Sequence, residues 1–447
     1  MKLKQQNDRV VYLGNTWEKT SWGCTQFPKL YAMRNGNIGL YVHEDDDSWV
    51  SLNPETGGCW LVSKDKGNSW EKATSEDIAM MGTQLPNGDV LRPLPNDPIS
   101  LKGVKRPPYR FGNYHIPTDS LKPEKPSSKD QLPTPITAIA NIWGGIHWVY
   151  ELDSMPDGLA DKRFTFHYLK NGETVSTKKK SEVEWNHRLA LEFKPHHSTR
   201  TDLEASMLQV PGLYSCRDVK VAPDNSLYVA MYEHGSNPFT GFYEGKYNPY
   251  ILRSFDNGDT WTIQSYIPHQ PDLEKDSLAA LEMGFVEPCL EFMPDGSMLC
   301  ILRTCEVPNG NPEWGPTYLC RSIDEGKTWS KPEYFTDIGA LPQLLQLENG
   351  VTLAVITRPG IYVYASNDCG KTWSERIEIM TGEDRSSLAN NPPQRPNFWQ
   401  WAGSCCNCTI LPLDKNKALL TYSDFYISDE DGVKRKGIKT VEIVVEP

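Results

Sequence analysis

Three charged residues carry the chemistry that this sequence suggests most clearly. Glu287 directly precedes Pro288. Arg303 lies at the far end of the hairpin that begins at Glu287, and Arg358 lies at the equivalent position of the next repeat. A carboxylate can act as a base or a nucleophile, and an arginine can grip a substrate carboxylate through two parallel hydrogen bonds. The same residues could instead neutralise one another as buried ion pairs, with Arg217 or Asp218 as further partners. Which interpretation applies depends on the elements that hold them.

A turn pattern that occurs four times identifies those elements. The pattern S-x-D-x-G-x-[ST]-W begins at Ser63, Ser254, Ser322 and Ser366. Its Asp can bond the local backbone, its Gly supplies a positive φ, and its Trp provides a large apolar anchor. Each copy therefore predicts a hairpin turn that is fixed to the body of its sheet and takes no part in chemistry.

A second repeat lies upstream of these turns. It consists of an apolar strand, a turn containing Gly or Asn, and another apolar strand, and its six copies begin at Phe27, Met80, Arg217, Glu287, Leu341 and Asn407. Four-stranded antiparallel sheets repeated along a chain are typical of propeller blades. We predict an all-β fold, one six-bladed β-propeller domain, with blades at about 27–73, 77–205, 212–268, 285–336, 340–380 and 404–447.

Two segments fall outside the regular repeat. Residues 9–14 predict a spare strand that joins the last blade and so closes the ring. Blade two carries a long insertion at about 94–160, whose aromatic residues favour a packed lid. Trp143, Trp148, His115 and His147 could stack on a ligand from this lid, or could simply pack it on the propeller.

The topology predicts which polar residues meet. In a propeller the first strand of each blade lines the channel, so strand-one starts and strand-two ends share one face. The residues at the start of the first strand of each blade are Gln26, Arg217, Asp218, Glu287, Gln343 and Asn407. Those at the end of the second strand are His43, Glu44, Asp45, Asp46, Asp47, Tyr232, Glu233, His234, Arg303, Arg358, Tyr422 and Asp424. Such a convergence of polar groups at a channel mouth indicates a functional site.

These motifs resemble the sialidase (neuraminidase) superfamily. The four turns are similar to its Asp boxes, and the segment from Phe285 to Arg303 resembles the stretch that holds its general-base glutamate and its second carboxylate-binding arginine. The resemblance implies that Glu287 is catalytic and that Arg303 and Arg358 bind a carboxylate. It also places the acid/base aspartate in the acidic run after His43, where we favour Asp46.

The sequence departs from that family at two places. Gln26-Phe27-Pro28 stands where the family has Arg-Ile-Pro, so the first arginine is a glutamine, and Arg217 could replace it. The nucleophilic tyrosine of the family has no counterpart in residues 401–407.

Glu233 and His234 form a second acid/base candidate pair, or a structural pair at a strand end. With Glu287, Glu233 would supply the two carboxylates that most glycosidases use.

Composition narrows the classes of partner. The chain has 447 residues and a formal net charge of −12, which argues against nucleic acid or an anionic membrane as the partner. No apolar run is long enough for a transmembrane helix, and the N-terminal residues do not resemble a signal peptide. The 11 cysteines favour reduced thiols and a cytoplasmic location, unless a signal peptide has been removed. Cys405, Cys406 and Cys408 lack a second pair at zinc spacing, and we expect neither metal nor cofactor.

Three functions remain open. The first is a sialidase-like glycoside hydrolase that acts in an exo mode on a terminal, acidic sugar of a glycan, with Glu287 as base or nucleophile, Asp46 or Glu233 as acid, and Arg303, Arg358, Arg217, Gln26 and Trp148 as substrate-binding residues. The second is a polysaccharide lyase in which an arginine neutralises a uronate while His234 or Tyr232 moves protons. The third is a glycan-binding propeller without catalysis. The sugar, the linkage and the stereochemical outcome stay open.

Overall fold

The computed structural model of the 447-residue chain describes most of its regular elements. The described residues are 1–16, 23–45, 58–95, 99–100, 132–133, 135, 137–140, 146–151, 154–156, 159, 163–184, 188–193, 206–210, 218–236, 239, 243–276, 279–280, 282–304, 315–358, 360–380 and 407–446. Within them the secondary structure is almost entirely β, with one short helix, α1 (Ser75–Ala79). The all-β prediction is confirmed. No helix in these ranges is long and apolar enough to cross a membrane.

Four sheets contain four antiparallel strands each. The first three follow chain order: β2 (Gln26–Ala32), β3 (Ile38–His43), β4 (Gly58–Ser63) and β5 (Glu71–Lys72); β19 (Phe285–Phe292), β20 (Met298–Thr304), β21 (Thr317–Ser322) and β22 (Glu333–Thr336); β23 (Gln343–Gln346), β24 (Thr352–Thr357), β25 (Ile361–Ser366) and β26 (Ile377–Met380). The fourth comprises β27 (Cys408–Asp414), β28 (Lys417–Ser428), β29 (Lys434–Glu446) and β1 (Lys2–Thr16). In it β1 pairs antiparallel with β29, so the predicted closing strand does join the last sheet.

A larger sheet of eight strands consists of two four-stranded halves. One half is β6 (Thr83–Gln84), β7 (Val90–Leu94), β11 (Arg163–Leu169) and β12 (Thr177–Glu184); the other is β15 (Val219–Val221), β16 (Leu227–Ser236), β17 (Tyr243–Ser254) and β18 (Thr260–Tyr266). Each half is antiparallel, and the halves join through the parallel pairing of β12 with β18.

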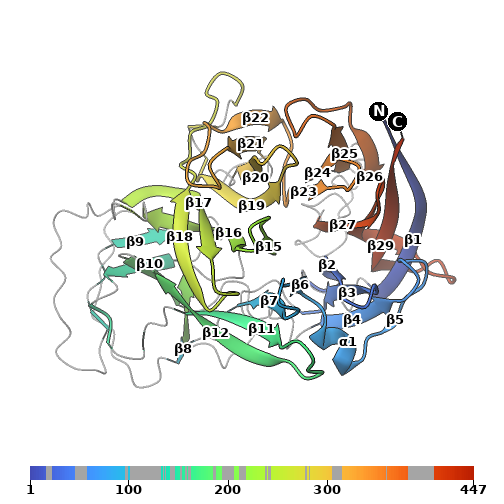
Figure 1. The fold of residues 1–447 in the computed structure, drawn as a ribbon, viewed down its shortest axis with the longest axis horizontal. Helices are drawn as coiled ribbons and strands as arrows, with labels where there is room; N and C mark the ends of the chain where they lie inside the picture. Colours follow the sequence, from blue (N-terminus) through green and yellow to red (C-terminus); the bar gives the residue numbers. More distant parts are fainter. Residues whose placement is uncertain are drawn as a thin grey trace.

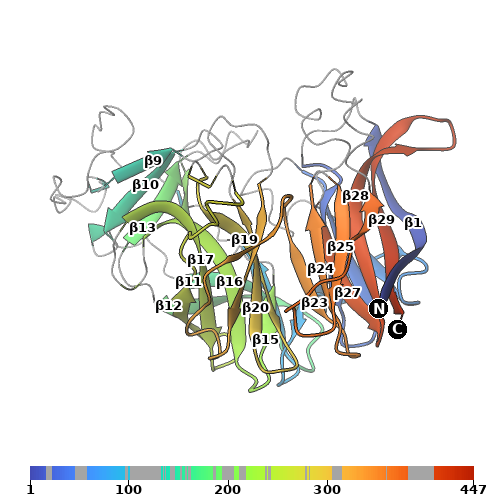
Figure 2. The same cartoon turned by 90° about the horizontal axis from the view of Figure 1, so that it is seen from above.

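The insertion contributes a sheet of its own. Its five strands are β8 (Ile99–Ser100), β14 (Ser206–Val210), β13 (Arg188–Phe193), β10 (Ile146–Glu151) and β9 (Thr137–Ala140). Since β13 and β14 follow β12 in the chain, the sheet draws on residues well beyond 94–160. Figures 1 and 2 show this sheet at the periphery, outside the ring formed by the other sheets.

Figure 1 shows the remaining sheets arranged around a centre, with β2, β6, β15, β19, β23 and β27 innermost and the two chain ends side by side. Polar contacts join several inner strands. Lys29 Nζ lies 3.1 Å from Asp218 Oδ1, and Lys220 Nζ lies 2.8 Å from Glu291 Oε2. These ion pairs join β2 to the start of β15, and β15 to β19.

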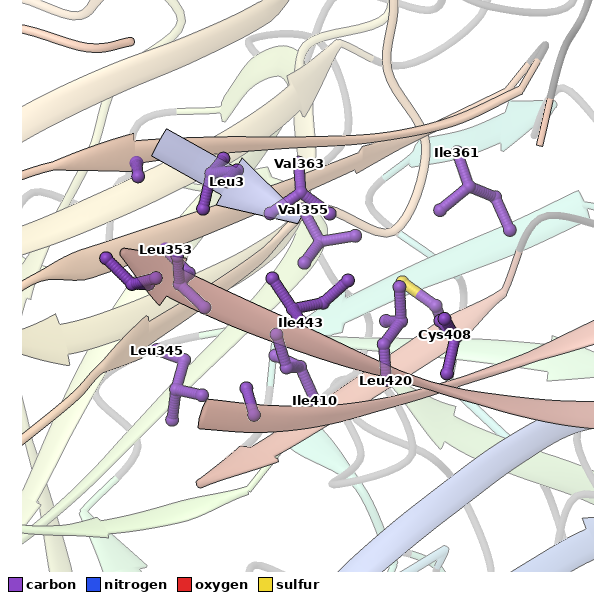
Figure 3. Close-up of a cluster of buried hydrophobic side chains, with 14 of the residues drawn as sticks. Leu3, Leu345, Leu353, Val355, Ile361, Val363, Cys408, Ile410, Leu420 and Ile443 are labelled. Atoms are coloured by element: carbon purple, nitrogen blue, oxygen red, sulfur yellow. The ribbon is translucent and has the colours of Figure 1, made fainter. Parts of the chain in front are cut away.

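Neighbouring sheets pack against each other through apolar side chains. Figure 3 shows the cluster between β23–β26 and the last sheet, which includes Val355 and Val363 from one side and Ile410 and Ile443 from the other. Leu3 of β1 belongs to the same cluster. Every residue of β24 is buried, because both faces of its sheet are covered.

The four repeated turns have the predicted hairpin geometry. In the connection between β21 and β22, Glu325 and Gly326 both have positive φ, 61° and 78°, as the central residues of a tight type I′ turn do. Thr328 donates its N–H to Asp324 Oδ1 (2.9 Å) and its hydroxyl to Oδ2 (2.6 Å). These hydrogen bonds lower the pKa of Asp324 to about 2, since they favour the ionised carboxyl.

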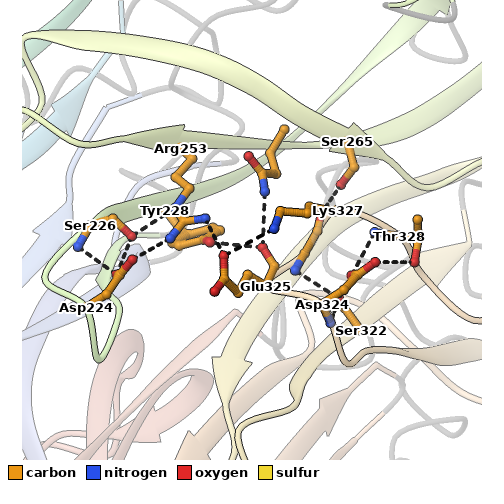
Figure 4. A network of polar contacts seen from close by, with 12 residues as sticks. Asp224, Ser226, Tyr228, Arg253, Ser265, Ser322, Asp324, Glu325, Lys327 and Thr328 are labelled. Atoms are coloured by element: carbon orange, nitrogen blue, oxygen red, sulfur yellow. Dashed lines mark hydrogen bonds and ion pairs between the residues drawn. The ribbon is translucent and has the colours of Figure 1, made fainter.

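An arginine that precedes one of these turns links adjacent sheets (Figure 4). Arg253 donates to Ser226 Oγ (3.0 Å) and to Asp224 on its own sheet, and to Glu325 Oε2 (3.0 Å) on the next sheet. Its guanidinium also lies 4.9 Å from the centre of the Tyr228 ring. Only 5% of the Arg253 side chain is exposed, whereas its carboxylate partners Asp224 and Glu325 are 50% and 62% exposed.

The Arg253 contacts predict a measurable contribution to stability. We expect Arg253→Met to lower the free energy of unfolding by about 2 kcal/mol, because charge-assisted hydrogen bonds of a buried group are lost. Equilibrium urea unfolding measures this. The matched control is Lys327→Met, since Lys327 approaches the same Glu325 at 3.5 Å but is 61% exposed; it should leave stability unchanged. Equal effects of the two substitutions would contradict the assignment.

Candidate functional site

The Glu287 carboxylate lies between two donors at one edge of the ring. Arg303 Nη1 donates to Glu287 Oε1 at 3.0 Å, and the Leu341 N–H donates to Oε2 at 2.7 Å. The Arg303 side chain is 6% exposed and that of Glu287 is 16% exposed. Register explains the meeting, because Val286 pairs with Arg303 at the start of β19 and the end of β20.

A backbone kink directs the Glu287 side chain. Glu287 has φ 50°, and the register between β19 and β20 shifts between Val286 and Cys289. A positive φ in a residue with a side chain is strained and is commonly found at functional sites. Phe27 and Leu341 have φ 48° and 45°, and each also precedes a proline at a strand-one start. The same kink therefore recurs in three sheets, with a carboxylate only in one.

Arg358 occupies the equivalent edge of the neighbouring sheet. It follows β24, has φ 59° and is 6% exposed. Its N–H donates to the Gly360 carbonyl at 2.7 Å, which fixes this backbone turn. Topology thus brings Arg303 and Arg358 to the same edge of adjacent sheets, as strand-two ends.

Gln26 is fully buried and its carboxamide is held in one orientation. Its Oε1 accepts hydrogen bonds from Lys436 Nζ at 2.6 Å and from the Gly23 N–H at 2.8 Å. Lys436 lies on β29, is itself fully buried, and also donates to the Cys24 carbonyl at 3.0 Å. Since two donors face the oxygen, the Nε2 group points away from them, and within the described ranges it has no acceptor.

The acidic run after β3 is described only at its start. His43 is fully buried, and its Nδ1 lies 2.9 Å from the Tyr41 hydroxyl, which is a structural role. Glu44 Oε1 accepts from Thr25 Oγ1 at 2.9 Å, and burial raises the pKa of Glu44. Asp45 is described, whereas the favoured Asp46 and its neighbour Asp47 lie outside the described residues.

Several other candidates are placed only in part. Arg217 lies outside the described residues, and only the backbone is described for Glu233, His234 and Trp148. Glu233 and His234 lie in β16 opposite Asn248 and Tyr247. Asp218 pairs with Lys29. The structure therefore brings together Glu287 with Arg303, and it leaves the roles of the remaining candidates as predictions.

Sequence analysis did not anticipate two buried groups at this edge. One is Lys436, whose contact with Gln26 spans 410 positions in the chain. The other is Glu282, which lies five positions before Glu287 and is 1% exposed. The local signal for Glu282 is its place just before the strand that begins at Phe285.

Comparisons with known proteins give distant similarities of fold. The sequence matches no protein-family model and no curated protein. Among solved structures, an α-L-arabinanase from Penicillium chrysogenum is 10% identical over 98% of both chains, with a TM-score of 0.45. A NanB sialidase variant from Streptococcus pneumoniae is 12% identical over 97% of this chain and 70% of that chain (TM-score 0.44). A protein of unknown function from Dyadobacter fermentans is 15% identical over 99% of both chains (0.45).

The Lys436 contacts predict a stability difference between two lysines of one strand. We expect Lys436→Met to lower the free energy of unfolding by about 2 kcal/mol, because Gln26 Oε1 and the Cys24 carbonyl lose a charged donor in a buried place. Lys439→Met is the control, since Lys439 pairs with Asp8 near the surface. Gln26→Glu should retain stability at neutral pH, because a carboxylate still accepts from Lys436. Urea unfolding measures all three, and an unaffected Lys436→Met protein would contradict this role.

Proposed function

We propose that the protein is a sialidase-like glycoside hydrolase that removes a terminal, acidic sugar from a glycan in an exo mode. The observation that carries the proposal is the partly exposed Glu287 carboxylate, held by Arg303 and by a backbone N–H on the edge that also carries Arg358. Such a carboxylate can act in the reaction, while arginines on the same edge can recognise an anionic sugar.

The fold proposed for this function is a six-bladed propeller in one domain. Support comes from four four-stranded sheets together with the two four-stranded halves of the larger sheet. The four S-x-D-x-G-x-[ST]-W turns are then Asp boxes on the face opposite the site. The five-stranded sheet of the insertion stands beside this ring as a lid or wall for the end of the glycan.

Glu287 is proposed as the base or nucleophile. Both of its oxygens accept hydrogen bonds, so the carboxylate is fixed in direction. Glycosidases use a second carboxyl as the acid, and Asp46 or Glu233 is proposed for that role. Arg303, Arg358 and the Gln26 amide would bind the sugar carboxylate, with Arg217 and Trp148 as further substrate-binding residues.

Substitution of Glu287 tests the catalytic role. We expect Glu287→Gln to lower kcat by at least about 100-fold, because the amide cannot act as base or nucleophile, with little change in KM. The assay uses terminal acidic and neutral glycosides, and product release is followed by chromatography. Glu291→Gln is the matched control, since Glu291 is on the same strand and also forms an ion pair, with Lys220, but lies further along the strand. A Glu287→Gln enzyme with the wild-type rate would remove the assignment.

Arginine substitution tests the choice of an acidic sugar. We expect Arg358→Met to raise KM for an acidic glycoside by about 10-fold or more, because one charged contact with the carboxylate is lost. The KM for a neutral glycoside should stay unchanged. An equal effect on both substrates would argue that Arg358 is structural.

The product distinguishes the proposal from a lyase on the same site. The glutamine at position 26 and the absence of a tyrosine in residues 401–407 are the features that favour a lyase or a binding protein. A lyase leaves a conjugated double bond that absorbs in the ultraviolet, whereas a hydrolase product does not. Glycan affinity without any turnover would instead identify a binding propeller.

A further inference from the structure

A buried acid, Glu282, lies directly behind the Glu287–Arg303 edge. Glu282 lies between β18 and β19, in the connecting segment 267–284. Its Oε2 lies 3.4 Å from His269 Nε2. Both side chains are at most 5% exposed. The ammonium group of Lys246 on β17 donates a hydrogen bond to the Glu282 backbone carbonyl. The carboxyl and the imidazole therefore meet away from water.

A second carboxyl lies beside Glu282. Asp276 is 4% exposed and accepts a hydrogen bond from the Tyr318 hydroxyl at 2.8 Å. The same hydroxyl accepts from the Asp272 N–H at 3.1 Å. Among the described residues, the titratable and charged groups around Glu282 are Lys246 from β17, His269 and Asp276 from the segment itself, and Tyr318 from β21.

The environment keeps Glu282 and His269 uncharged near neutrality. Burial, with Asp276 beside it, raises the pKa of Glu282 to about 8. Burial, with Lys246 nearby, lowers the pKa of His269 to about 3. Their contact at neutral pH is thus one between a neutral acid and a neutral imidazole. Loss of the Glu282 proton would place a second negative charge beside Asp276 in a site with little solvation.

The backbone at Gly315 packs closely against the Glu282 carboxyl. A Cβ atom on Gly315 would lie 3.2 Å from Glu282 Oε1 and 2.1 Å from Thr304 Oγ1, so the backbone at Gly315 closes over both groups. Thr304 directly follows Arg303 at the end of β20. On the other side, the Tyr247 N–H donates to the Met283 carbonyl at 2.7 Å.

We propose that Glu282, His269 and Asp276 form a proton-dependent latch. While Glu282 is protonated, the latch holds residues 267–276 and 282–284 against the end of β20 and so keeps the Glu287–Arg303 pair in place. When Glu282 ionises, repulsion from Asp276 loosens the segment. The latch is a property of the fold, so its stability test does not require the proposed glycosidase activity.

The test compares Glu282→Gln with the wild type across pH. Because the folded protein holds the Glu282 proton more tightly than the unfolded chain, stability should fall as pH rises from about 4.5 to about 8. We expect the unfolding equilibrium constant of the wild type to rise by up to about tenfold per pH unit, relative to Glu282→Gln, over that range. Glutamine keeps the shape but has no proton to lose. Urea unfolding at a series of pH values measures the ratio.

Two further measurements separate a latch from a merely buried acid. Trypsin should cleave after the exposed Lys275 faster at pH 9 than at pH 7 in the wild type, after correction for the rate on a free peptide, and equally at both in Glu282→Gln. Asp276→Asn should move the transition to lower pH, because a neighbouring negative charge is removed. Glu274→Gln, an exposed acid in the same segment, is the control and should behave as wild type. A Glu282→Gln protein with the wild-type pH dependence, or cleavage at Lys275 that does not change with pH, would overturn the latch.

Discussion

The pairing of β1 with β29 is the contact on which the arrangement depends, because it joins the two ends of the chain. Without it, β29 would present an unpaired edge, which sheet proteins avoid. Leu3 of β1 packs into the apolar cluster between the last two sheets. The pairing also orders β29, from which Lys436 reaches Gln26 at the start of β2. Closure of the fold and orientation of a candidate site residue therefore rest on the same strand.

The site arises from a repeated backbone device with one altered side chain. Phe27, Glu287 and Leu341 each stand before a proline with φ near 45–50°. Proline fixes the next residue and removes an N–H, so the strand begins with a kink. At Glu287 the kink turns the carboxylate toward the next sheet, where the Leu341 N–H donates a hydrogen bond to it. The same strained backbone position thus occurs in three sheets, and of these three residues only Glu287 carries a charge.

The sequence predicted the features that depend on local patterns. The repeated strand–turn–strand pattern and the four turns predicted the four four-stranded sheets, the additional strand at 9–14 and the proximity of Glu287 to Arg303, since one hairpin separates them. It did not predict the Lys436–Gln26 contact, because no local pattern relates residues 410 positions apart. Residues 188–193, which form β13, were assigned to blade two, and residues 206–210, which form β14, to no blade, because the pairing of these strands with β10 and β8 is set by tertiary contacts.

Two glutamates five positions apart illustrate how environment sets the role of a carboxyl. Glu287 accepts from an arginine and from a backbone N–H, which are partners that an ionised carboxylate favours. Glu282 instead faces another acid and a neutral imidazole, and its pKa is raised to about 8. The partly exposed carboxylate of Glu287 therefore suits the proposed chemistry, and the buried Glu282 suits the proposed control of the segment behind it.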